Sequence, residues 1–176
     1  MIDVSSRLHG STLTAVEAQL GELLAKSRAS HALIIDLRGF VLLHVGASGA
    51  PEAPSLDSLG SLIASNFSAT TALARLFGEK GFKELTQQGK DIGTYTEELG
   101  DEALLVTVFS ITEPLGRIKY LSKKTVEALT LMLTASGEPP PVLTLDADWE
   151  QLNDELFDAL LPNTLPPKTQ PKTGDA

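Results

Sequence analysis

The sequence predicts an α/β domain in which five strands and three helices follow the order α-β-β-α-β-β-β-α. Helical and strand-like apolar periodicities alternate in this order along residues 1–136. The first two strand segments and the last two are separated by tight turns, which is typical of antiparallel hairpins. A third observation concerns residues 55–78, a helical segment in the middle of this order that carries too few charges to turn one face to water. Together these features predict one domain built around a central helix.

The length and charge of the chain indicate one domain followed by an acidic tail. The 176 residues are enough for one domain with a full hydrophobic core. Residues 1–136 carry 12 Lys and Arg against 15 Asp and Glu, whereas residues 137–176 carry 2 against 8, so the net charges are −3 and −6. The total of −9 argues against a nucleic-acid partner, because phosphate binding needs a basic surface.

Two absences in the sequence bear on the class and location of the protein. The chain has no cysteine, which excludes a disulfide framework, thiol catalysis and a thiolate metal site. Its N-terminus lacks the apolar run of a signal peptide, and no segment has the length and hydrophobicity of a membrane span. We therefore expect a cytoplasmic protein without a membrane span.

Residues 11–28 are expected to form the first helix. Ser11 or Thr12 is the expected N-cap, because a hydroxyl side chain can accept a hydrogen bond from a free N–H of the first turn. The apolar residues that recur on one face of this helix are Leu13, Val16, Leu20, Leu23 and Leu24.

Two strands are expected next, at residues 33–35 and 40–43, with a tight turn between them. Gly39 lies in this turn and is free to adopt a positive φ. Asp36 precedes the turn, and its carboxylate is expected to accept hydrogen bonds from the turn backbone rather than to act in catalysis.

The central helix is expected at residues 55–78, with Ser55 as its cap and Gly78 at its end. Small residues at positions 60, 64, 68 and 72 form a stripe beside the large apolar side chains. A helix that is apolar or small almost all round contacts neighbours on more than one side. We interpret it as a core helix that also forms a dimer or partner surface, the alternative being a fully buried helix within one domain.

Three further strands and a helix complete the domain. Residues 82–89, 91–99 and 102–110 are the expected strands, although the composition of the first would also permit a helix. The last helix is expected at residues 112–136, with Pro114 in its first turn, where the missing N–H costs nothing.

No pattern of catalytic or metal-binding residues stands out. His9, His31 and His44 are too scattered in the sequence to suggest a metal site. The sequence has no GxxxxGK[ST] phosphate loop and no GxSxG elbow. Arg38, at the tip of a hairpin, has the reach of an arginine finger, but a turn arginine is ordinarily a solvated surface residue. We expect no metal, no cofactor and no catalytic residue.

Three stretches, with the Gln88-Gly89 turn, together resemble the Roadblock family of dynein-light-chain-like domains, and within it the bacterial MglB-type regulators of Ras-like GTPases. They are ALIIDLRGFVLLH at residues 32–44, SLGSLIASNFSATTALARLFGE at 58–79 and ALLVTVFSITEPLGRIKYLSKK at 103–124. The sequence departs from the AGN common in the family, since Ser65 replaces the glycine, whereas Asn66 is retained. The resemblance covers roughly residues 8–136.

The resemblance implies a three-layer fold with a five-stranded, largely antiparallel sheet. It also implies a homodimer that forms through the central helix and the sheet edge, since pairing of identical surfaces is the commonest route to soluble oligomers. The residues expected at this dimer interface are Leu59, Gly60, Ile63, Ala64 and Phe67.

For function, the resemblance implies that the dimer binds an MglA-type Ras-like small GTPase in its GTP form. It would accelerate GTP hydrolysis without supplying an arginine finger, in control of cell polarity or motility. The small side chains would let a partner approach the helix backbone closely, unless the homodimer alone buries them. The residues expected to bind the GTPase are Asn66, Ser68, Ala69, Ala72 and Arg75.

Two other classes of function remain open at this point. The first is a Roadblock scaffold that binds a GTPase or another partner without altering hydrolysis. The second is a sensor of small ligands, which would need a polar-lined pocket. A preference for the GTP form separates an activator from a scaffold, because binding shifts an equilibrium only through differential affinity.

The acidic tail divides into three segments. Residues 137–144 are expected to form a Pro-rich linker, residues 145–161 an acidic amphipathic helix and residues 162–176 a disordered end. The helix would contact the GTPase or pack back on its own domain or that of the dimer mate. The residues expected to make this contact are Trp149, Leu152, Leu156 and Phe157.

Overall fold

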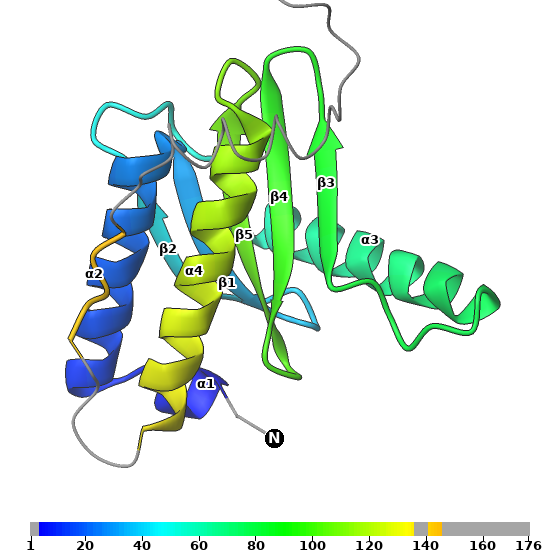
Figure 1. Ribbon diagram of the computed structural model, residues 1–176, viewed down its shortest axis with the longest axis horizontal. Helices are drawn as coiled ribbons and strands as arrows, with labels where there is room; N and C mark the ends of the chain where they lie inside the picture. The colour runs from blue at the N-terminus through cyan, green and yellow to red at the C-terminus, as the bar shows by residue number, and fades with distance from the viewer. Residues whose placement is uncertain (1–3, 136–140, 146–176) are drawn as a thin grey trace, which may run out of the picture. The chain divides into compact units, whose positions relative to one another are not determined.

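The chain folds into a five-stranded antiparallel sheet with helices on both faces (Figure 1). The computed structural model describes residues 4–135 and 141–145. The strand order is β2-β1-β5-β4-β3. This architecture confirms the predicted three-layer α/β fold and adds one short helix, α1. The elements are α1 (Val4–Arg7), α2 (Gly10–Ser27), β1 (His31–Asp36), β2 (Val41–Gly46), α3 (Leu56–Leu76), β3 (Glu84–Gln88), β4 (Ile92–Leu99), β5 (Ala103–Ser110) and α4 (Leu115–Thr134).

The N-terminal helices differ from the expectation in two respects. α1 has only four residues, which is too short to produce a helical periodicity in the sequence. α2 begins at Gly10, with His9 at the N-cap position and no side-chain cap. The predicted caps Ser11 and Thr12 lie inside the first turn, so that prediction is wrong.

Separate hydrophobic clusters fill the two faces of the sheet. On one face, α2 and α4 pack against each other and against the sheet, and the largest side chains buried there are Tyr95 and Phe109. On the other face, α3 packs through Ile63, Ala64 and Phe67. β1 is buried along its whole length, because it pairs with β2 and β5 and both of its faces are covered.

The β1–β2 turn is organised by Asp36, as predicted. One oxygen of its carboxylate accepts hydrogen bonds from the backbone N–H groups of Arg38 (3.0 Å) and Phe40 (2.8 Å). Gly39 adopts a positive φ of 97°, which is also as predicted. The expected strand at residues 40–43 starts one residue too early, because Phe40 belongs to the turn and β2 begins at Val41.

The second half of the sheet is a meander of three strands. The ambiguous segment 82–89 contains a strand, β3, which pairs with β4 and leaves one edge of the sheet open. α4 begins later than expected, at Leu115, so Pro114 is the residue before the helix rather than part of its first turn. The reason is a turn in which the backbone N–H of Glu113 donates to the carbonyl of Ser110 (2.9 Å).

An ionic network ties the edge strand β3 to α4. The carboxylate of Glu84 pairs with Lys119 and, at 3.2 Å, with Lys123, and it accepts a hydrogen bond from the Tyr95 hydroxyl (2.9 Å). Burial would raise the pKa of Glu84, but the hydrogen bonds from Lys119, Tyr95 and Lys123 outweigh it and lower the pKa to about 2. Glu84 is therefore ionised at neutral pH and holds one end of β3 in place.

Candidate functional site

The candidate site is the outward side of α3, and the limits of this helix follow from the sequence. The Ser55 hydroxyl accepts a hydrogen bond from the backbone N–H of Ser58 (3.5 Å), which confirms Ser55 as the cap. At the other end Gly78 adopts a positive φ of 79°, and the N–H of Glu79 donates to the carbonyl of Ala74 (3.1 Å). The helix therefore ends where the sequence predicts.

The inward side of α3 is seated on the sheet and on the β1–β2 turn. Gly60 is essential to this seat, because a Cβ atom there would clash with the carbonyl oxygen of Gly39. The structure places four of the five residues expected at a dimer interface on this side, where they are buried within their own chain, and leaves Leu59 half-buried. The four buried residues are Gly60, Ile63, Ala64 and Phe67.

The outward side of α3 carries two stripes, each with the alternating spacing of four and three residues that keeps side chains on one helix face. We call them the small stripe and the apolar stripe. The small stripe consists of Ser61, Ser65, Ser68, Ala72 and Arg75, all exposed. The apolar stripe consists of Leu62, Asn66, Ala69, Leu73 and Leu76, all exposed except the half-buried Asn66.

These stripes divide the residues that the sequence assigns to GTPase binding. Ser68, Ala72 and Arg75 share the small stripe, whereas Asn66 and Ala69 lie on the apolar stripe. The helical periodicity did not predict this division, because it places the exposed leucines in one group with the core-facing ones. The signal that could have found it is the 4-3 spacing itself.

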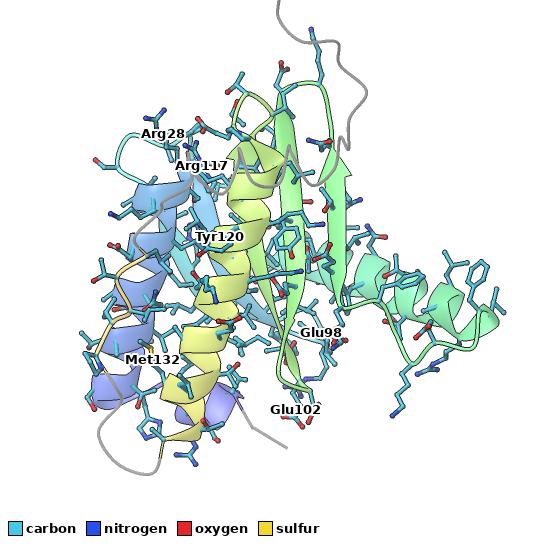
Figure 2. All side chains as sticks on the ribbon, in the orientation of Figure 1. Arg28, Glu98, Glu102, Arg117, Tyr120 and Met132 are labelled. Carbon is cyan, nitrogen blue, oxygen red and sulfur yellow. The ribbon has the colours of Figure 1, made fainter. Side chains whose placement is uncertain are left out.

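The apolar stripe runs onto a part of α3 that extends beyond the sheet. Figure 1 shows α3 continuing past β3, and Figure 2 shows side chains at this end projecting with no other element beside them. Leu62, Leu76 and the neighbouring Phe77 are 70%, 81% and 74% exposed. Several large apolar side chains exposed on one side of a helix are typical of protein–protein contacts.

Two of the three histidines lie closer together than the sequence suggests. Nδ1 of His31 on β1 and Nε2 of His44 on β2 are 3.2 Å apart, because both side chains lie on the same face of adjacent strands. Burial, followed by the charge of His31, lowers the pKa of His44. The pair borders a cavity of about 190 Å³ that is mainly apolar. Within the described residues, no group of three His, Asp or Glu side chains could hold a metal ion.

The start of the acidic tail is held against the α2–α4 face. The side-chain amide of Gln19, fully buried on α2, donates to the carbonyl of Leu143 (3.1 Å) and accepts from its N–H (2.8 Å). Leu145 is buried in the same hydrophobic cluster. The predicted tail contacts Trp149, Leu152, Leu156 and Phe157 lie outside the described residues.

This antiparallel sheet, with two helices on one face and one long, partly uncovered helix on the other, defines a Roadblock-like three-layer α/β domain. The chain belongs to the Roadblock/LC7 domain family, whose model matches residues 15–109. No helix in the described part of the chain is long and apolar enough to cross a membrane.

Solved structures give the same assignment. The chain is 46% identical to an MglB with a tetrameric arrangement, over 70% of this chain and 90% of that one, with a TM-score of 0.68. It is also 46% identical to the gliding protein MglB of Thermus thermophilus, over 70% and 91% of the two chains, with a TM-score of 0.67. For MglB of Myxococcus xanthus the identity is 27%, the coverage 66% and 93%, and the TM-score 0.61. A comparison with curated protein sequences found no match.

Proposed function

We propose that this protein is an MglB-type regulator that forms a homodimer, binds an MglA-type Ras-like GTPase in its GTP form and stimulates GTP hydrolysis. It would do so without an arginine finger, in cytoplasmic control of cell polarity or motility. The observation that carries the proposal is the outward side of α3, which offers two different stripes to two different partners. The similarity to MglB supports it independently.

In the proposed dimer, the apolar stripe faces a second copy of the chain. Its leucines stand at the spacing of a helix–helix seam, and the small Ala69 in the middle permits close approach of the two helices. The open edge of β3 offers unpaired backbone groups beside this seam. The residues first expected at the interface would act indirectly, since Ile63, Ala64 and Phe67 hold α3 on the sheet.

The small stripe is the proposed surface for the GTPase. Ser68 and Ala72 have short, exposed side chains, so a partner can contact the helix backbone there. Arg75 follows on the same stripe, and no described residue forms a salt bridge with its guanidinium group. It is therefore available for a charge-assisted bond to the partner.

The proposal is tested by single-turnover GTP hydrolysis by the MglA-type GTPase of the same organism, with and without this protein. We expect a large acceleration that is lost in Ala72→Arg, because a long cationic side chain prevents close approach. The matched control is Ala18→Arg, which places the same side chain at an exposed position of α2 and should leave the acceleration unchanged.

The scaffold alternative predicts a different result in the same assay. The GTPase would bind equally well in its GDP and GTP forms, and its hydrolysis rate would not change. Such a result would overturn the activator and leave a Roadblock protein that only holds its partner.

A further inference from the structure

We propose that the pair formed by His31 and His44 is a proton-sensitive contact. Uptake of a second proton separates the two imidazole rings and loosens the loop of residues 51–54, which leads into α3. Neither a GTPase nor a second copy of the chain is needed for this response, and the proposed function leaves both histidines without a role.

The first observation is that strand pairing brings the two imidazole rings into direct contact. His31 of β1 stands opposite Gly46 of β2. Because this glycine has no side chain, the neighbouring side chain of His44 reaches across, and its Nε2 atom lies 3.2 Å from Nδ1 of His31. A Cβ atom on Gly46 would lie only 3.4 Å from the same Nδ1 atom, so a side chain there would crowd the pair.

The short distance between the rings limits how many protons the pair can hold. One ring nitrogen donates a proton in this hydrogen bond, and the other must be unprotonated to accept it. The bond therefore forms when the pair is neutral or carries one positive charge, but not when both rings are imidazolium. In the doubly charged pair two N–H groups point at each other, and the rings must move apart.

The surroundings of the pair make the second proton costly. His31 is only 7% exposed, and His44 is half-buried. Burial, followed by the charge of His31, lowers the pKa of His44 below its ordinary value of 6.5. The pair therefore keeps its hydrogen bond at neutral pH and loses it on acidification.

The second observation connects the pair to the start of α3. Both histidines line the cavity of about 190 Å³ together with residues 51–54 and with Leu59, which lies in the first turn of α3. Two charged imidazole rings need hydration, and a cavity of this size has room for water. Water that enters wets the apolar wall formed by Pro51, Ala53 and Pro54, so the loop loosens.

Glu52 is the one charged residue among the described residues that line this cavity. Its carboxylate attracts a protonated pair and so opposes part of the cost of the second proton. The elements around the pair contribute only apolar or hydroxyl side chains to the cavity, namely Ser30, Leu33, Leu59, Ile92, Thr94 and Val108.

The test is an NMR titration of the full-length protein from about pH 8 to about pH 5, which spans the range in which histidine titrates. We expect the pair to titrate in two separate steps, and the lower pKa should lie below the ordinary histidine value of 6.5. The amide signals of Glu52 and Ala53 should move with this lower step towards the positions of an unstructured chain. A single step, or loop amides that ignore the lower step, would overturn the inference.

Two variants assign this response to the pair. His44→Gln keeps a side chain that can hydrogen-bond to His31 but cannot titrate, so we expect one step for His31 and loop amides that stay in place. The matched control is His9→Gln, because His9 is exposed at the N-cap position of α2 and should leave the loop response unchanged. A loop that still responds in His44→Gln would overturn the inference.

Stability gives a second measurement. Between the lowered pKa of His44 in the folded protein and its ordinary value of 6.5, the unfolded chain binds more protons than the folded one. Acidification through this range should therefore destabilise wild type relative to His44→Gln, and His9→Gln should follow wild type. Urea denaturation at a series of pH values measures the difference. A difference between wild type and His44→Gln that stays constant, or that changes in favour of wild type, would overturn the inference.

Discussion

The two faces of the sheet differ in how completely the chain covers them. On one face α2 and α4 lie side by side (Figure 2). Met132 of α4 belongs to the hydrophobic core that these helices share, and Tyr120 packs against this core. On the other face a single helix, α3, covers part of the sheet and then continues past β3 (Figure 1). Of the large apolar side chains of α2 and α4, only Leu131 is exposed, and we call this face the finished face. On the other, open face, Leu62, Leu73 and Leu76 of α3 are all exposed to water. The difference is what we expect if the first face serves stability and the second serves the proposed association.

The largest expected effect on stability comes from the contact between Gly60 and Gly39, which positions α3 on the β1–β2 turn. Gly60→Ala places a Cβ atom against the carbonyl oxygen of Gly39, closer than two such atoms can approach, so the helix or the turn must move. We expect the free energy of unfolding to fall by about 1–3 kcal/mol. Urea denaturation followed by circular dichroism measures the change.

The control for this variant lies on the finished face. A Cβ atom on Gly21 of α2 meets nothing within 4 Å, so Gly21→Ala should stabilise the protein by up to about 1 kcal/mol through helix propensity. If the two substitutions changed the free energy of unfolding equally, the contact at Gly60 would not position α3.

A smaller effect on stability is expected from Glu84, whose ion pairs with α4 hold the edge strand β3. The pKa of Glu84 is about 2 in the folded protein and 4.5 in its ordinary environment, so the folded state binds fewer protons between these values. The stabilisation from Glu84 is therefore fully present above pH 4.5 and is lost as the pH falls towards 2.

The measurement is the pH dependence of stability for wild type and Glu84→Gln. The difference in their free energies of unfolding should be roughly constant above pH 4.5 and should shrink below it. We expect the change to be smaller than the effect of Gly60→Ala, because Glu84 and its lysine partners are partly exposed and water screens their attraction. A difference that grows on acidification would contradict the assigned network, because it would give the pKa shift of Glu84 the opposite sign.

Much of the finished face could be predicted from the sequence. α2 has charges on one side and leucines on the other, and each of the five strands overlaps its expected segment. β1 (His31–Asp36) and β2 (Val41–Gly46) are longer than the expected 33–35 and 40–43. Local rules also located Asp36 in its turn and Ser55 at its cap, because each depends only on residues a few positions away.

The open face could not be predicted to the same depth. α3 is apolar or small almost all round, so periodicity alone does not tell the leucines that face the sheet from those that face water. The close backbone approach of Gly39 and Gly60 fixes which side of the helix lies against the turn only together with the packing of Ile63, Ala64 and Phe67, and all these contacts join positions far apart in the sequence. The His31–His44 pair was missed for the same reason, since strand pairing brings the two residues together.

Whether a second copy covers the open face is tested most directly by the molar mass of the protein in solution, measured by light scattering for wild type and Leu73→Asp. We expect wild type to be a dimer, with twice the 18.7 kDa of one chain. Leu73→Asp should give a folded monomer, because it places a charge in the apolar stripe that we propose a second copy covers. A monomeric wild type, or a variant that keeps the dimeric mass, would contradict the claim that a second copy completes the open face.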